Sequence, residues 1–221
     1  RRGFERFPVR SFSAKVRTPV DVAILAGGRA RRLGGVDKSA LMVGRASILE
    51  RELAAVDDLA DRIILVGGDP DAHESARVRV VADRLPGAGA IGGLYTALCE
   101  TATPYVLVLA CDLPFISARV LGRLAALARG PVDAVVPRTP DGWQPLCAAY
   151  ARRLGTRVRR HIESGHLKVQ DLLAEVRVRE LGPDDLASID PTGRSFINVN
   201  TPDDLGRASS MAARADRHPR R

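Results

Sequence analysis

Short apolar runs alternate along the chain with segments whose apolar residues recur at helical spacing. Residues 105–110, YVLVLA, form a nearly continuous apolar run, which is typical of a parallel strand buried on both faces. This alternation predicts an α/β fold, a single three-layer, doubly wound domain with a mostly parallel, Rossmann-like sheet. We predict further strands at 22–26, 63–66, 78–81, 134–136 and 176–181, and helices at 47–56, 92–100 and 117–128, the last capped by Ser117.

Two segments interrupt this alternation. Residues 141–150, DGWQPLCAAY, combine turn residues with a short apolar stretch, and we predict an antiparallel excursion there. Residues 152–163 form a strongly basic segment of helical character. The chain has no internal repeat, so one domain accounts for the whole pattern.

Positive charge is concentrated at the two ends of the chain. Of the net charge of +8 over 221 residues, residues 1–20 contribute +5 and residues 205–221 contribute +4, which leaves the region between them at −1. We therefore predict a basic, flexible N-terminal extension at 1–20, one domain at 21–206 and a basic C-terminal tail at 207–221. The tails lack interleaved aromatic residues for stacking on bases, so solvated ends are favoured over nucleic-acid-binding arms.

Composition argues against several other classes of protein. The hydrophobic content of 45% indicates a globular chain, and no apolar run approaches the roughly 20 residues that span a membrane. Three cysteines without a CxxC pair and four histidines without ligand spacing disfavour a disulfide framework or a transition-metal centre. We expect a soluble, cytoplasmic protein.

The stretch ILAGGRARRLGGVDKSAL, residues 24–41, directly follows the first predicted strand. In open α/β sheets the loops at the carboxyl ends of the strands bind ligands. Glycines allow backbone N–H groups to approach a ligand, and basic side chains neutralise phosphate charge. A glycine-rich surface turn with solvated arginines is the alternative, but the position after the first strand favours a polyphosphate site. Its candidate residues are Gly27, Gly28, Arg31, Arg32, Gly34, Gly35 and Lys38.

A carboxylate, Asp112, follows the apolar strand in the segment LVLACDLPF. A lone carboxylate in such a place is costly to desolvate unless a cation meets it. Mg²⁺ shared with substrate phosphates is the natural partner. The alternative role, a cap for the following helix, is already taken by Ser117.

Four motifs together resemble one known family. LAGGRARRLGGVDK is similar to the LAGGxxxRxGGxDK signature of molybdenum cofactor guanylyltransferases, which belong to the nucleotidyltransferase superfamily and have the nucleotide-diphospho-sugar transferase fold. ACDLPF resembles the metal-binding CDxP segment of the family, and FINVNTPDDL, residues 196–205, resembles its NxNTPxDL motif. PGAGAIGGLYTAL, residues 86–98, stands at the place of a GPLAGL-like turn, after a strand that ends in Asp83. The resemblance covers residues 21–206.

The resemblance implies an activity and a set of site residues. The reaction is the Mg²⁺-dependent transfer of GMP from GTP to the terminal phosphate of molybdenum-molybdopterin, with release of pyrophosphate. Lys38, Arg31 and the glycine N–H groups hold the leaving phosphates, Asp112 binds Mg²⁺, and Asp83 belongs to the nucleoside pocket. Leu25, Ala26 and Gly27 contact the nucleotide, and Asn198 and Asn200 lie near the catalytic centre. Gly67 and Gly68 depart from the family pattern, which often has an Asn there.

The acceptor site and the competing functions stay open at this stage. A basic strip, defined as Arg152, Arg153, Arg157, Arg159, Arg160 and Lys168, is a candidate for a phosphorylated pterin, with Trp143 and Gln144 beside its ring; a solvated helix face is the alternative. Competing functions are transfer from CTP or to another phosphorylated acceptor, and a non-catalytic nucleotide-binding protein that hands the cofactor on. Besides GTP and molybdenum-molybdopterin, molybdoenzyme maturation proteins are expected as partners.

Overall fold

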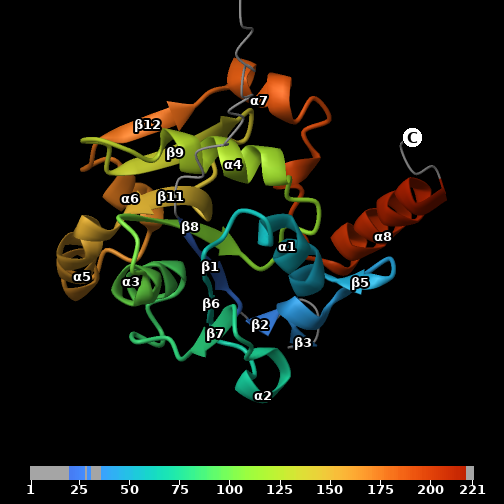
Figure 1. Cartoon of the computed structure of the whole chain (residues 1–221), viewed down its shortest axis with the longest axis horizontal. Coiled ribbons are helices and arrows are strands. Elements are labelled where there is room, and N and C mark those ends of the chain that lie inside the picture. Colours follow the sequence, from blue (N-terminus) through green and yellow to red (C-terminus); the bar gives the residue numbers. More distant parts are fainter. Residues whose placement is uncertain (1–19, 28, 31–35, 218–221) are drawn as a thin grey trace, which may run out of the picture.

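A computed structural model describes residues 20–27, 29–30 and 36–217. Its centre is an eight-stranded sheet in the order β10-β9-β11-β8-β1-β6-β7, with β12 paired to β9 (Figure 1). All of these strands except β10 and β11 run in the same direction, which confirms the predicted mostly parallel α/β sheet. The strands are β1 (Asp21–Leu25), β6 (Ile63–Val66), β7 (Val78–Val81), β8 (Tyr105–Ala110), β9 (Ala134–Thr139), β10 (Gly142–Trp143), β11 (Cys147–Ala151) and β12 (Val178–Leu181). Two short ribbons pair β2 (Arg29–Ala30) with β3 (Val36–Asp37) and β4 (Met42–Val43) with β5 (Ala46–Ser47).

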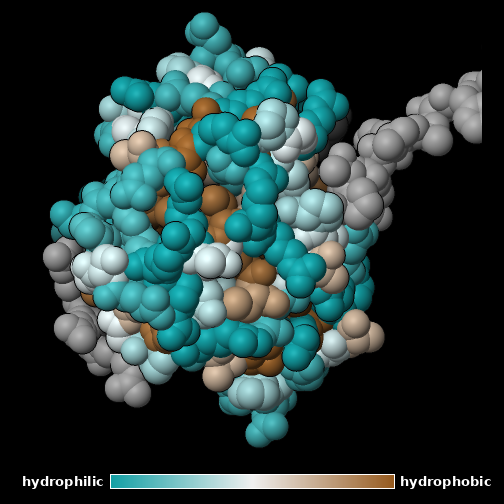
Figure 2. All heavy atoms as spheres, turned by 90° about the vertical axis from the view of Figure 1, so that its left-hand side faces the viewer, coloured by the Kyte–Doolittle hydropathy of each residue, from teal (hydrophilic) through white to brown (hydrophobic). Residues whose placement is uncertain are grey.

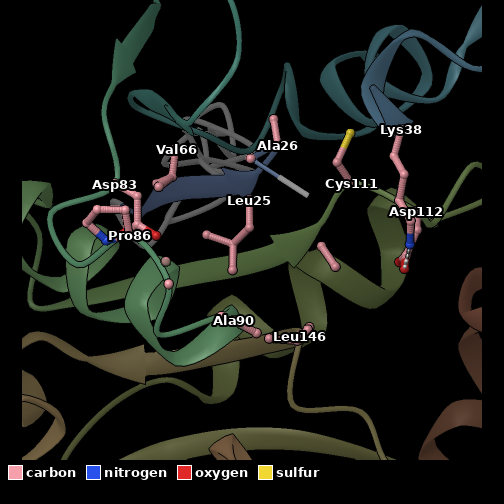
Figure 3. A pocket seen from close by; sticks show the side chains of 15 residues that line it. Leu25, Ala26, Lys38, Val66, Asp83, Pro86, Ala90, Cys111, Asp112 and Leu146 are labelled. Carbon is pink, nitrogen blue, oxygen red and sulfur yellow. Dashed lines mark hydrogen bonds and ion pairs between the residues drawn. The ribbon is translucent and has the colours of Figure 1, made fainter. Parts of the chain in front are cut away.

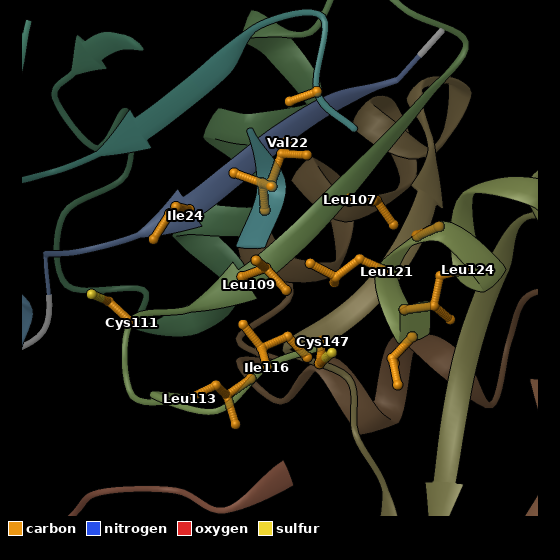
Figure 4. Close-up of a cluster of buried hydrophobic side chains, with 14 of the residues drawn as sticks. Val22, Ile24, Leu107, Leu109, Cys111, Leu113, Ile116, Leu121, Leu124 and Cys147 are labelled. Carbon is orange, nitrogen blue, oxygen red and sulfur yellow. The ribbon is translucent and has the colours of Figure 1, made fainter. Parts of the chain in front are cut away.

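Helices cover both faces of the sheet, as the three-layer prediction requires. One face carries α1 (Ile48–Val56), α4 (Ala118–Leu127), α7 (Pro183–Ile189) and α8 (Pro202–Arg217), and the other carries α3 (Ala90–Glu100), α5 (Gly155–Glu163) and α6 (Val169–Leu173). A short helix, α2 (Pro70–His73), packs against β7. In β8, Leu107 and Leu109 face the α1–α4 side, whereas Val106 and Val108 face the α3–α5 side. Figure 4 shows the first of these cores, where side chains of β1 and β8 meet Leu121 and Leu124 of α4.

Strand β11 corrects the prediction for residues 141–150. The strand is antiparallel as predicted, but it lies inside the sheet and pairs with both β8 and β9 instead of forming an excursion. All five of its residues, CAAYA, are buried, and its small side chains allow helices to pack on both faces. Its largest side chain, Tyr150, is fully buried and donates its hydroxyl to the carbonyl of Pro145 at 2.7 Å. An antiparallel strand inside the sheet therefore separates β9 and β12 from the parallel strands β8, β1, β6 and β7.

Both helices that start near the site have serine caps, of which the cap of Ser117 was predicted. The Ser47 hydroxyl accepts the Glu50 amide at 3.1 Å and the Glu50 carboxylate accepts the Ser47 amide at 2.6 Å, a reciprocal capping box for α1. The Ser117 hydroxyl accepts the Arg119 amide at 3.2 Å and caps α4. Asp112 therefore is not the cap of α4.

The predicted boundary at residue 206 falls inside α8, which continues to Arg217. Ala208 and Ala212 of this helix are buried in the core on the α1–α4 face. The helix thus continues into the segment predicted as a C-terminal tail, and its buried residues reach Ala212. Of the predicted N-terminal extension, Val20 is described and is buried in the core, and the other residues lie outside the described part. Within the described residues, no helix combines the length and the apolar composition that crossing a membrane requires.

Candidate active site

A cavity of about 570 Å³ opens at the carboxyl ends of β1, β6 and β8. This is the edge where ligands bind in open α/β sheets. In Figure 3, Asp83 and Pro86 lie on one side of Leu25, and Lys38 and Asp112 lie on the other. Six predicted site residues line the cavity together: Leu25, Ala26, Gly27, Lys38, Asp83 and Asp112.

The Lys38 ammonium joins three segments that are far apart in the sequence. Its Nζ lies 3.4 Å from Asp112 Oδ2 and donates a hydrogen bond to Asn200 Oδ1 at 2.6 Å. The backbone reinforces this junction, because the Val199 amide donates to the Asp112 carbonyl at 3.0 Å. A cation, a carboxylate and an amide therefore meet at one end of the cavity.

Asp112 occupies a largely buried position, with 18% of its side chain exposed. Burial disfavours its charged form and raises its pKa above the usual range, while the charge and the hydrogen bond of Lys38 act in the opposite direction. A cation at this carboxylate is therefore stabilising. Among the described residues no group of three or more His, Cys, Asp or Glu side chains has the arrangement of a metal site. Asp112 fits Mg²⁺, which commonly takes one or two carboxylates and completes its shell with waters and substrate phosphates.

Asp83 organises the other side of the cavity. Its Oδ1 accepts hydrogen bonds from the Leu85 amide at 3.0 Å and from the Thr96 hydroxyl at 2.9 Å. Oδ2 has no hydrogen bond to any described residue, so it can accept one from a ligand. Gly93 permits α3 to pack close, since a Cβ there would lie 3.0 Å from Leu25 Cδ1.

The structure explains why a glycine stands at position 67, where the family pattern often has an Asn. Its φ is +80°, and a Cβ at this residue would lie 2.6 Å from Gly27 Cα and 2.7 Å from Gly27 N. The amide of Gly27 in turn donates to the Val66 carbonyl at 3.1 Å. The loops after β1 and β6 are therefore in backbone contact, and this contact positions the edge of the cavity.

Replacing Gly67 with alanine is expected to destabilise the protein by about 2–4 kcal/mol, because the new Cβ meets backbone and the φ is left-handed. Gly130→Ala is the matched control, since Gly130 has a φ of +68° but no atom within 4 Å of its Cβ position. Urea unfolding of both variants measures the difference. Equal losses in the two variants would contradict the backbone contact.

Comparison with known proteins identifies the family. Residues 22–180 match the family described as MobA-like NTP transferase domain. The chain belongs to this family. A molybdenum cofactor guanylyltransferase of Desulfosudis oleivorans is 30% identical to the chain over 187 residues, covering 85% of this chain and 93% of that protein. A probable molybdenum cofactor guanylyltransferase of Chloroflexus aggregans is 37% identical over 189 residues, covering 82% and 89%. These relatives confirm the predicted family resemblance, and the chain is a nucleotidyltransferase.

Solved structures agree with the fold of this MobA-like chain. Molybdopterin-guanine dinucleotide biosynthesis protein A of Archaeoglobus fulgidus superimposes with a TM-score of 0.77 at 28% identity, covering 88% of this chain and all of that one. The 2-C-methyl-D-erythritol 4-phosphate cytidylyltransferase of Thermus thermophilus gives a TM-score of 0.65 at 21% identity, covering 88% and 99%. The second likeness shows the fold alone.

The remaining predicted residues of the MobA-like site divide into two groups. Asn200 is half-buried at the Lys38 junction, whereas Asn198 is exposed and does not line the cavity. The other predicted residues, Gly28, Arg31, Arg32, Gly34 and Gly35, lie outside the described part of the chain. Their roles stay predictions.

Several guanidinium groups of the basic strip already have protein partners. Arg153 pairs with Asp133 at 2.9 Å, Arg159 pairs with Glu163 at 2.6 Å, and the Arg157 guanidinium donates to the Glu175 carbonyl at 2.7 Å. None of the strip residues lines the cavity. Figure 2 shows the side of the molecule that carries α5, where hydrophilic residues dominate the surface. The solvated-face interpretation is therefore favoured over the acceptor site.

Trp143 and Gln144, predicted beside the pterin ring, are engaged in local contacts. The Trp143 Nε1–H donates to Glu180 Oε2 at 3.1 Å, and the Gln144 side-chain amide donates to the Thr139 hydroxyl at 2.9 Å. Neither residue lines the cavity. Within this segment the cavity is lined by Leu146, which directly precedes β11.

Glu52 supports the site and was missed in the sequence. It lies on the buried face of α1 with Ile48 and Val56, and its Oε1 accepts the Leu113 amide at 3.1 Å, one residue beyond Asp112. Burial raises its pKa well above the usual range; the Leu113 hydrogen bond opposes this and the charge of Asp112 reinforces it. The signal was an acidic residue at position i+4 within the apolar stripe of residues 48–56.

Glu52→Gln is expected to keep the hydrogen bond to Leu113, whereas Glu52→Ala leaves that amide unpaired and is expected to destabilise the protein by about 2 kcal/mol or more. The pKa of Glu52 is higher in the folded state than in the unfolded state. The unfolded state therefore loses its proton first as pH rises, and the free energy of unfolding of the wild type falls between the two pKa values. Glutamine removes that pH dependence. Urea unfolding of the wild type and both variants between pH 5 and 9 tests this; a steeper pH dependence in Glu52→Gln than in the wild type would contradict it.

Proposed function

We propose that the protein transfers GMP from GTP to the terminal phosphate of molybdenum-loaded molybdopterin and releases pyrophosphate. The observation that carries this proposal is the meeting of Lys38, Asp112 and Asn200 at one end of a cavity whose other side presents Asp83. The names of the relatives, which match over about nine-tenths of their own length, support the choice of nucleotide and acceptor.

The reaction requires that the acceptor phosphate is aligned with the α-phosphorus of GTP and that the negative charge of the phosphates is neutralised. An oxygen of the acceptor phosphate attacks the α-phosphorus of GTP, and the bond from that phosphorus to the bridging oxygen breaks, so that the electron pair leaves with pyrophosphate. A phosphate monoester is largely ionised at neutral pH, because its second pKa is about 6, and it needs no strong general base. The reaction therefore depends on cations placed where the phosphates carry negative charge.

The residues of the cavity have distinct parts in this proposal. The Lys38 ammonium, held by Asp112 and Asn200, would approach the leaving phosphates and balance their charge. Mg²⁺, when bound, would supply further charge neutralisation on the phosphates, and the Asp112 carboxylate would hold it. Oδ2 of Asp83, which has no partner in the described part of the chain, would accept a hydrogen bond from the nucleoside.

Pyrophosphate release measures the proposed reaction directly. The purified protein is incubated with Mg²⁺, molybdenum-loaded molybdopterin and each of the four ribonucleoside triphosphates in turn. We expect pyrophosphate release with GTP and not with the other three triphosphates. Chelation of Mg²⁺ should abolish the release. Release with CTP would replace guanylyl transfer by cytidylyl transfer, and no release with any nucleotide would contradict this acceptor.

A further inference from the structure

A second cavity, of about 420 Å³, is lined by the segment that follows Asp112. The first cavity ends at Cys111 and Asp112, and the second begins at Pro114. We call it the α1–α4 cavity, because it opens between Arg51 of α1 and the start of α4. Residues of the segment 190–195, which precedes Asn200, also line it.

Two arginines make this cavity positive. The Arg51 Nε donates to the Val43 carbonyl at 2.9 Å, and its guanidinium carbon lies 5.8 Å from the ring centroid of Phe115. Neither Arg51 nor Arg194 forms an ion pair with any carboxylate in the described part of the chain. Both guanidinium groups thus keep donors for a ligand.

Asp190 is the acidic residue of the cavity, and both of its carboxylate oxygens accept hydrogen bonds from its own loop. Its Oδ2 accepts the Ser195 amide at 2.8 Å, and its Oδ1 accepts the Thr192 hydroxyl at 3.1 Å. These bonds fold residues 190–195 into a compact turn and place Arg194 and Ser195 at the cavity. The two arginines exceed the one carboxylate, so the net charge favours an anion.

Ser195 supplies a buried hydrogen-bond donor without a partner. The residue is 1% exposed, and its hydroxyl oxygen has no hydrogen-bond partner among the described residues. A buried polar group in this state is costly unless a ligand or water satisfies it. Ser117, which also lines the cavity, caps the ten-residue helix α4, whose N-terminal end attracts negative charge.

We propose that the α1–α4 cavity binds a phosphate group, separately from the nucleotide. Arg51 and Arg194 would neutralise its charge, and the Ser195 hydroxyl would donate to one of its oxygens. This site goes beyond the proposed transfer reaction, because its existence does not require that reaction. Its position makes it adjacent to the chemistry, since residues 112–117 form one continuous segment between the two cavities.

Titration of the full-length protein with inorganic phosphate tests the site. Calorimetry is performed at constant ionic strength, with and without saturating Mg²⁺ and GTP, so that phosphate binding at Lys38 is recognised by its competition with the nucleotide. We expect saturable phosphate binding that persists with the nucleotide present. Arg194→Gln and Arg51→Gln should each weaken it at least about 10-fold, on the scale of a lost charge-assisted hydrogen bond.

Two further variants separate the site from general charge effects. Ser195→Ala should weaken phosphate binding by about threefold or more. Arg119→Gln is the matched control, because Arg119 is exposed in the first turn of α4 and does not line the cavity. Absence of nucleotide-independent phosphate binding, or equal weakening by Arg119→Gln and Arg194→Gln, would overturn the proposal.

The source of the phosphate is distinguished in the pyrophosphate-release assay. If the acceptor molecule places a phosphate here, added inorganic phosphate raises the KM for the acceptor and leaves kcat unchanged. If the ligand is a free phosphate ion or another effector, kcat changes instead. Either result supports the site, provided that Arg194→Gln removes the effect; an effect that survives in Arg194→Gln would refute it. Because calorimetry needs no turnover, failure of the transfer reaction and failure of this site are separate outcomes.

Discussion

Replacing Asp112 with asparagine is expected to lower kcat at least about 100-fold, on the scale of losing a positioned electrostatic group. Asparagine keeps the shape of the side chain but removes the negative charge that would hold Mg²⁺. The fold should survive, because burial already disfavours the charged form of Asp112 and raises its pKa. We therefore expect the free energy of unfolding to change by less than about 1 kcal/mol.

Steady-state kinetics and urea unfolding of the same preparation separate these two effects. Asp184→Asn is the matched control, since Asp184 is exposed at the start of α7 and its replacement removes the same charge. We expect this control to keep wild-type turnover. Near-normal turnover in Asp112→Asn would reject the assignment of Asp112 to the reaction centre.

Replacing Lys38 with alanine is expected to cost at least about 100-fold in kcat/KM, because Lys38 is the ammonium that would balance the charge of the leaving phosphates. Lys168→Ala is the control, since it removes an exposed lysine of the basic strip that does not line the cavity. The same control tests the strip, and we expect its kinetics to match the wild type.

The double variant Lys38→Ala, Asp112→Asn shows whether the two residues act as a unit. Their side chains are 3.4 Å apart, so the loss in the double variant should be smaller than the product of the single losses. Independent, multiplicative losses would contradict a shared reaction centre.

Local burial explains why most of the fold was predictable from the sequence. The apolar run of β8 is buried on both faces of the sheet, and its composition indicates that directly. The place of β11 was not predictable, because an antiparallel strand between β8 and β9 is chosen by long-range pairing rather than by its own five residues. The extent of α8 was missed because positive charge dominates residues 207–217, although Ala208 and Ala212 are the residues that pack.

The sequence predicted those site residues that stand in a short local motif. Lys38, Asp83 and Asp112 each stand in such a motif, and the structure brings all three to one cavity. The contact between Lys38 and Asn200 spans 162 residues, and only the fold brings those two side chains together. For the basic strip the sequence left an acceptor site and a solvated face open, because the ion pair between Arg153 and Asp133 joins residues 20 positions apart and leaves no local signal.

The most direct test of the central claim follows the α-phosphate of the nucleotide. The protein is incubated with Mg²⁺, molybdenum-loaded molybdopterin and GTP labelled at the α-phosphorus, and the products are separated. We predict that the label moves into the pterin product, that pyrophosphate is unlabelled, and that Lys38→Ala and Asp112→Asn abolish the transfer. Label that remains in GTP, or that is transferred equally well by both variants, would contradict guanylyl transfer at this centre.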